Sequence, residues 1–123
     1  MTNMENMRNK RAIGDTGEEI AVRYLENYGY IMIKRNYHSP YGEIDIIASK
    51  GEYIVFVEVK YRKNRLYGEP SQAVDYKKQE KIKKTALQYI SENEVGDKDF
   101  RFDILEITGM GEVKINHIEN AFC

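Results

Sequence analysis

The sequence predicts an α/β fold in which one central mixed β-sheet is flanked by helices, in the order α-β-β-β-α-β-β. Two stretches carry apolar residues at the spacing of an amphipathic helix, and five others are rich in β-branched and aromatic residues. The run Tyr53–Val59 is apolar at alternating positions on both sides except at Glu58, which is typical of a central strand covered on both faces. A chain of 123 residues with 41% hydrophobic residues is long enough to bury one continuous core.

The N-terminal part of the chain contains the first predicted helix. Residues 1–12 are polar and are expected to be a disordered tail, which leaves residues 13–123 as a single domain. The helix is predicted over Asp15–Tyr28, because apolar residues recur there at helical spacing from Ala21 onward and Gly29 is placed to end it.

The remaining elements follow from alternation, helical spacing and turn residues. A first hairpin is expected from strand Tyr30–Tyr37 and the turn at residues 39–42, because proline and glycine fix such turns. The later elements are strands Glu43–Ala48 and Tyr53–Tyr61, helix Ser71–Ser91, and strands Asp99–Thr108 and Glu112–Ile118.

Composition excludes several classes of protein. No stretch approaches the roughly 18 apolar residues of a membrane span, and residues 1–11 lack the apolar run of a secretory signal, so we expect a cytoplasmic protein with no membrane partner. The only cysteine is Cys123, which excludes an intrachain disulfide and a cysteine-based zinc site.

Charge is balanced overall but clustered locally. A net charge of −1 argues against coating nucleic acid by bulk attraction, so any phosphate binding must be local. Two basic runs are present, and each could also be an ordinary solvated face. They consist of Lys60, Arg62, Lys63 and Arg65, and of Lys77, Lys78, Lys81, Lys83 and Lys84.

The most unusual charges lie on the most hydrophobic strand. With a side-chain period of two, Phe56, Glu58 and Lys60 share one face, so two opposite charges follow an apolar pattern. Burying an unpaired carboxylate or ammonium costs several kcal/mol, so these groups need a neighbour, a metal ion or an exit to solvent. A structural ion pair at a strand end explains the pair equally well.

Asp45 interrupts the preceding apolar strand and favours a site. Ile44 and Ile46 are expected to point one way, with Asp45 on the other side. If Lys50 and Gly51 form a two-residue loop, Asp45 lies opposite Phe56 and diagonal to Glu58, on the same face of the sheet. A register slipped by one residue would separate the two carboxylates. Together they suit Mg²⁺ or Mn²⁺.

Both predicted helices offer further polar groups. Glu18 lies on the inward stripe of the first helix, although its capping-box spacing from Asp15 would also explain it. On the second helix, Lys78 falls on the inward face with Gln79 at its flank, and both would reach the same region unless Lys78 merely lies over a core edge.

Several segments resemble the YraN-type family of small bacterial proteins. They are Gly17-Glu18, Gly42–Ile47, Phe56–Lys60, Lys78-Gln79, Arg101–Asp103 and Ala121-Phe122. That family is similar to archaeal Holliday-junction resolvases and to the PD-(D/E)XK nuclease superfamily. The resemblance implies a restriction-endonuclease-like (PD-(D/E)XK) core with Asp45, Glu58 and Lys60 as catalytic residues, and Glu18 as the helix glutamate of resolvases. Ile44 stands where the superfamily's namesake proline would be.

The resulting hypothesis is a metal-dependent endonuclease that hydrolyses DNA phosphodiesters, with branched DNA as the first substrate by analogy with resolvases. Asp45, Glu58 and the Val59 carbonyl would hold Mg²⁺ or Mn²⁺. The residues expected to contact the nucleic-acid backbone are Arg62, Lys63, Lys77, Lys78 and Gln79. A two-fold homodimer would suit cleavage of two strands. The alternative is a non-catalytic nucleic-acid-binding or scaffold protein that retains the nuclease fold.

Overall fold

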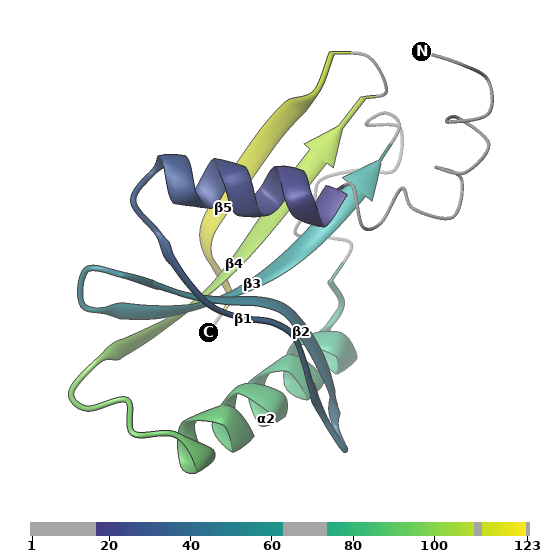
Figure 1. The fold of residues 1–123 in the computed structure, drawn as a ribbon. Helices are drawn as coiled ribbons and strands as arrows, with labels where there is room; N and C mark the ends of the chain where they lie inside the picture. Colours follow the sequence, from purple (N-terminus) through teal and green to yellow (C-terminus); the bar gives the residue numbers. More distant parts are fainter. Residues whose placement is uncertain (1–16, 63–73, 110–111, 123) are drawn as a thin grey trace.

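The computed structural model describes residues 17–62, 74–109 and 112–122, which form one five-stranded sheet with a helix on each face (Figure 1). The predicted tail at residues 1–12 lies outside the described residues. The first helix occupies residues 17–27. It is followed by β1 (Ile31–Ser39), β2 (Gly42–Lys50), β3 (Tyr53–Arg62), α2 (Tyr76–Glu92), β4 (Asp99–Thr108) and β5 (Lys114–Phe122).

The strands lie in the sheet in chain order, β1-β2-β3-β4-β5. Neighbouring strands are antiparallel except for β3 and β4, which are parallel and are connected through α2. A parallel pair needs such a crossover, because a tight turn can only reverse the chain. The predicted mixed sheet and its element order are therefore confirmed.

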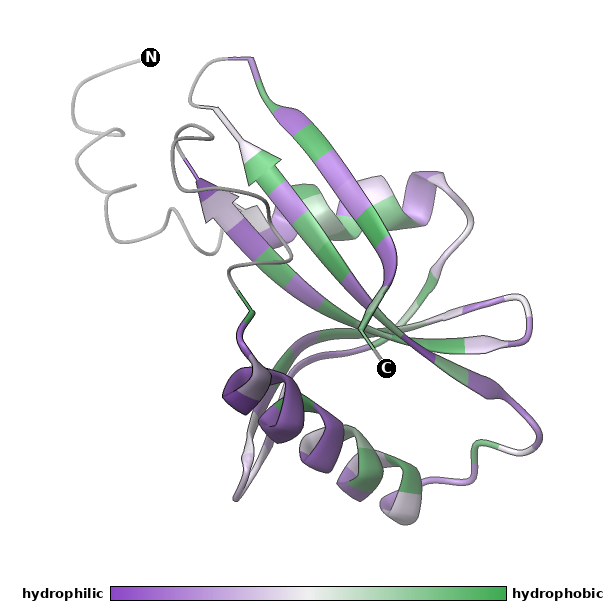
Figure 2. Cartoon of the chain, turned by 180° about the vertical axis from the view of Figure 1, so that it is seen from behind, coloured by the Kyte–Doolittle hydropathy of each residue, from purple (hydrophilic) through white to green (hydrophobic). Residues whose placement is uncertain are grey.

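Two hydrophobic clusters separate the layers, one on each face of the sheet. Ile54 and Phe56 of β3 pack in the cluster that includes Ile82, Ala86 and Tyr89 of α2. The intervening residues of the same strand, Val55 and Val57, pack in the cluster on the other face. That cluster includes three residues of the first helix, which are Ala21, Val22 and Leu25. Figure 2 shows hydrophobic and hydrophilic residues as separate bands along the strands. The expectation of a central strand covered on both faces is correct.

Most strand boundaries differ from the prediction by one or two residues, and two larger differences have a physical cause. Val74 and Asp75 are not helical, and α2 begins at Tyr76 because Asp75 is its N-cap, accepting a hydrogen bond from the Lys78 backbone N–H at 2.9 Å. At the other end of the chain, β5 continues beyond Ile118 to Phe122. Phe122 is buried and stacks on the Phe102 ring at 5.2 Å, which holds the extension in place.

The turn between β2 and β3 is shifted from its predicted position. Lys50 pairs with Tyr53, so the two turn residues are Gly51 and Glu52. Gly51 has a φ of 57°, a conformation that glycine adopts without steric cost. The predicted pairing of Asp45 with Phe56 is wrong, since Phe56 lies opposite Ile47. The shift is two residues, however, so the residues of β2 that pair with β3, from Ile46 to Lys50, keep their predicted faces.

The first residues of β2, before Ile46, pair with β1 but not with β3. The pairs of β2 with β3 end at Ile46 and Val57, whereas β1 and β2 stay paired to Ser39 and Gly42. As a result Ile44 packs in the α2 cluster and Ile46 in the other, so the prediction that both point one way is wrong. No helix in the described parts of the chain is long and apolar enough to cross a membrane.

Candidate functional site

Asp45 is fixed at the point where β2 separates from β3. Its Oδ2 accepts a hydrogen bond of 2.8 Å from the backbone N–H of Val59. The Asp45 carboxylate therefore accepts a hydrogen bond from the edge of β3 at a position where β2 no longer pairs with β3. Because the N–H and C=O of one strand residue point to the same edge, the Val59 carbonyl faces this gap as well.

Glu58 lies next to Asp45 and between two lysines. Its side chain is only 11% exposed, and its Oε1 is 3.3 Å from the ammonium of Lys78 on α2. The ammonium of Lys60, two residues along β3, lies 3.8 Å from the same oxygen. The structure thus brings Asp45, Glu58, Lys60 and Lys78 together, as the sequence analysis expected of them.

The surroundings shift the proton affinities of this cluster. Burial, reinforced by the charge of Asp45, raises the pKa of Glu58 to about 7 despite the opposing effect of both lysines. Burial also lowers the pKa of Lys60, and the adjacent Lys78 adds to this. For Lys78 burial acts downward too, but its contacts with Lys60 and Glu58 outweigh burial and raise its pKa. Such perturbed groups gather preferentially at functional sites.

A cavity of about 390 Å³ opens beside this cluster. It lies between the start of β2, the end of β3 and the first turns of α2. The lining residues are Gly42, Glu43, Glu58, Asp75, Lys77, Lys78, Lys81 and Ile82. Lys81 was not among the predicted site residues, although its position one turn after Lys77 and Lys78 could have indicated it.

The predicted role of Glu18 is not supported by a contact with this cluster. Glu18 belongs to the first helix, and its Oε1 lies 3.8 Å from the Nε of Arg35 on β1, which also binds Glu19 at 2.7 Å. Among the described residues no hydrogen bond or ion pair links Glu18 to Asp45 or Glu58. A site role for Glu18 stays a prediction.

Three other predicted residues lie apart from the cavity or beyond the described residues. Gln79 donates its side-chain amide to the Val74 carbonyl at 3.0 Å, a contact at the start of α2. The Nε of Arg62 is 3.6 Å from Glu106, whose side chain is fully buried. Lys63 lies outside the described residues. Glu106 was missed, although it interrupts the apolar run of β4 much as Glu58 interrupts β3.

Two groups of side chains could be considered for a metal ion. Asp45 and Glu58, with the Val59 carbonyl, offer hard oxygens, and because burial and Asp45 raise the pKa of Glu58, a cation bound there would stabilise its charged form. The second group is Asp103, His117 and Glu119, whose potential ligand atoms lie within 4.8 Å of one another. There the Arg101 guanidinium already binds both oxygens of Asp103, each at 2.9 Å, so a cation would have to displace it. The first group is the better fit.

Comparison with known proteins places these features in a family context. Residues 17–107 match the model of a family described as uncharacterised protein family UPF0102, and this region contains every residue of the Asp45 cluster. A UPF0102 protein of Alkaliphilus oremlandii is 49% identical over 115 residues, which is 91% of this chain and 98% of the relative. A relative from Sulfurihydrogenibium sp. is 51% identical over 105 residues, or 85% and 89% of the two chains. One from Clostridium botulinum is 46% identical over 114 residues, or 89% and 93%.

Proposed function

The chain belongs to the uncharacterised protein family UPF0102, which confirms the resemblance to the YraN-type family, and from its site we propose that it is a metal-dependent endonuclease acting on DNA. The observation that supports this most strongly is the convergence of Asp45, Glu58 and Lys60 where β2 leaves β3. Carboxylates that hold a divalent cation beside an ammonium group suit hydrolysis of a phosphodiester, because the positive groups stabilise negative charge as it develops.

Asp45 and Glu58 would hold Mg²⁺ or Mn²⁺, together with the Val59 carbonyl. When bound, the ion would polarise the phosphate and lower the pKa of a bound water. Asp45 is already oriented for this by its hydrogen bond to the Val59 N–H, which occupies Oδ2. Glu58 would gain a positive neighbour, which its burial makes favourable.

The lysines of the cluster have separable roles in this proposal. Lys60 emerges from the same strand face as Glu58, where its ammonium would orient the attacking water or stabilise charge on the phosphate. Lys77 and Lys78 line the cavity from α2 and would bind the DNA backbone without reading sequence. Arg62 and Gln79 are left out because Glu106 and Val74 engage them in the structure.

Branched DNA is the first substrate to test, because backbone contacts alone can select DNA by its shape. A two-fold homodimer would present two such sites to two strands. The alternative function is that of a DNA-binding protein that retains the fold and its charges without hydrolysing anything. Its predicted sign is binding that is independent of a divalent ion.

The test is cleavage of single-stranded, duplex and four-way DNA by the purified chain with Mg²⁺, Mn²⁺ or EDTA. We expect cleavage only with a divalent ion, and its loss in Asp45→Asn and in Lys60→Ala. Lys98→Ala is the matched control, since Lys98 bonds the Gly51 carbonyl at the opposite end of β3. Binding without cleavage under every condition would favour the alternative function.

A further inference from the structure

A row of exposed lysines continues along α2 beyond the candidate cavity. The helix carries five lysines and two glutamates, and Lys77, Lys81 and Lys84 are exposed at successive helical turns. Lys77 and Lys81 line the candidate cavity. At a rise of about 1.5 Å per residue, Lys84 lies roughly 10 Å farther along the helix axis than Lys77. That separation is on the scale of two nucleotides of a DNA strand, given roughly 3.4 Å per stacked nucleotide and more when extended.

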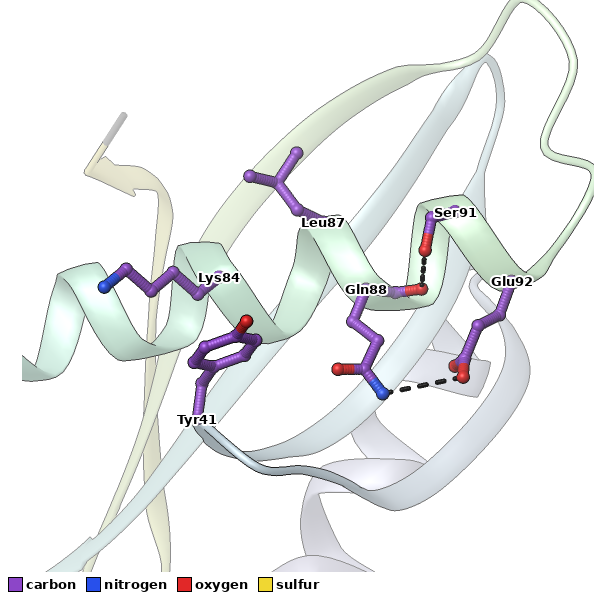
Figure 3. Close-up of a pocket in the computed structure, with 6 residues that line it drawn as sticks. All are labelled: Tyr41, Lys84, Leu87, Gln88, Ser91 and Glu92. Atoms are coloured by element: carbon purple, nitrogen blue, oxygen red, sulfur yellow. Dashed lines mark hydrogen bonds between the residues drawn. The ribbon is translucent and has the colours of Figure 1, made fainter.

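Lys84 opens onto a second pocket, with a volume of about 650 Å³, between α2 and the turn that joins β1 to β2. Figure 3 shows the Tyr41 ring standing beside α2 and close to Lys84. Tyr41 is half exposed, and the Lys84 ammonium lies 5.8 Å from the centroid of the Tyr41 ring. The other lining residues are Leu87, Gln88, Ser91 and Glu92.

The turn that carries Tyr41 is fastened to α2. The backbone N–H groups of Tyr41 and Gly42 donate to the hydroxyl of Ser39, at 3.0 Å and 3.3 Å. That hydroxyl in turn lies 2.9 Å from the hydroxyl of Thr85 on α2. Gly42 lines the first cavity and Tyr41 lines the second, so the two pockets meet at consecutive residues. The backbone that carries the Tyr41 ring is therefore anchored to α2 beside both pockets.

We propose that an unpaired nucleotide binds in this second pocket, with its base stacked on Tyr41 and the adjoining phosphates along Lys77, Lys81 and Lys84. This inference rests on the proposed nuclease function, because it describes the path of the DNA strand that enters the Asp45 cluster. A base in the interior of a duplex has both faces covered by its neighbours, so a base stacked on Tyr41 within the bound strand requires a single-stranded segment next to the cleaved bond.

Charge sets the orientation of the strand in the pocket. Lysines along one side of the groove attract phosphates. Glu92 at the far end would repel a phosphate, and its Oε1 accepts a hydrogen bond from Tyr37. The base and not the backbone therefore faces Gln88 and Glu92, whose polar atoms can bond base edges.

The experiment measures binding in EDTA, where cleavage is excluded, to a duplex with an unpaired arm and to a blunt duplex of equal length. Tyr41→Ala is expected to weaken binding of the armed DNA by about fivefold or more, because one stacked base is worth roughly 1–3 kcal/mol. Binding of the blunt duplex should not change. Tyr41→Phe should retain the armed-DNA affinity, since the ring remains. Lys84→Ala should reduce the salt dependence of binding by about one phosphate contact.

Tyr28→Ala is the matched control, because Tyr28 is 61% exposed but lies next to the first helix, on the opposite face of the sheet. A 2-aminopurine base placed at successive positions of the arm should report stacking at one position, and that signal should vanish in Tyr41→Ala. Equal binding of armed and blunt DNA, or an equal loss in Tyr28→Ala, would overturn the inference.

The two proposals fail in different ways. Tyr41-dependent binding of armed DNA without cleavage in any metal would refute the nuclease function and leave the nucleotide pocket in place. Metal-dependent cleavage with unchanged armed-DNA binding in Tyr41→Ala would refute the pocket and leave the nuclease function in place.

Discussion

Two carboxylates of the same sheet, Glu58 on β3 and Asp103 on β4, respond to burial in opposite ways. Asp103 is fully buried, which alone would raise its pKa, but hydrogen bonds from His117, Arg101 and the Asn120 N–H outweigh burial and lower it. Glu58 lies on the opposite face, and there burial and Asp45 outweigh two lysines and raise its pKa to about 7.

The difference lies in how completely each negative charge is satisfied. Both oxygens of Asp103 bind Arg101, and each has one further partner, at 2.7 Å for His117 and 3.0 Å for Asn120. A satisfied network of this kind stabilises a fold. Glu58 instead meets its lysines at 3.3 Å and 3.8 Å next to a second carboxylate, so a bound cation or substrate could improve its surroundings. We infer that the Asp103 network is structural and that the Asp45 cluster is the functional one.

The largest expected effect is on stability, from Asp103→Asn. The change removes the buried charged partner of the Arg101 guanidinium and leaves it the exposed Glu119 at 3.3 Å, so the free energy of unfolding should fall by about 3–5 kcal/mol. Urea unfolding at pH 7 measures the loss, with exposed Asp97→Asn as a control that should change little. A loss below about 1 kcal/mol would show that the network contributes little to the fold.

The acid dependence of stability gives the sign of the same contribution. The pKa of Asp103 is lowered from 3.8 in the fold, so its stabilisation is complete above that value. It should be lost as the pH falls through the lowered folded-state value. The stability difference between wild type and Asp103→Asn should therefore shrink in strong acid.

Glu58→Gln is expected to have the opposite effect in metal-free protein. The folded-state pKa of about 7 lies above the ordinary 4.5, so ionisation destabilises the fold increasingly between these two pH values. Above pH 7 the variant should be more stable than wild type by on the order of 3 kcal/mol. Below pH 4.5 the two should be nearly equal. Unfolding in EDTA at pH 4, 6 and 8 measures this, and a less stable variant at pH 8 would contradict the account.

A bound divalent ion should offset most of that difference. Mn²⁺ at about a hundred times its Kd should stabilise the wild type by roughly 2.7 kcal/mol, because it binds the folded state. Asp45→Asn and Glu58→Gln should lose most of this gain, whereas His117→Asn should keep it. Thermal unfolding with and without Mn²⁺ compares the four proteins. Equal stabilisation of all of them would place the ion elsewhere.

The smallest effect is expected on the exposed side of α2. Lys77→Ala and Lys84→Ala should each change the free energy of unfolding by less than about 0.5 kcal/mol, since both lysines are exposed. Urea unfolding of the two variants checks this. Small values would mean that any loss of DNA binding in these variants reflects lost phosphate contacts. Unfolding of either variant at low urea would instead assign its lysine a structural role.

The sequence predicted the charged cluster better than it predicted the path of the chain. Glu58 and Asp45 were recognisable because each interrupts an apolar strand, a signal that depends only on alternation. The same rule would have identified Glu106. The separation of the first residues of β2, before Ile46, from β3 was not predictable, because alternation assumes a regular strand. The irregularity extends to β1, which pairs with β2. It has a register shift between Met32 and Lys34 and a φ of 52° at Asn36.

The most direct measurement is the effect of Mn²⁺ on the backbone amide signals in an NMR spectrum of the labelled protein. A bound paramagnetic ion broadens the signals of nearby residues, so the broadening maps the ion to one face of the sheet. We predict strong broadening at Asp45, Glu58 and Val59, and its loss in Asp45→Asn. Broadening centred on Asp103, His117 and Glu119 would contradict the account.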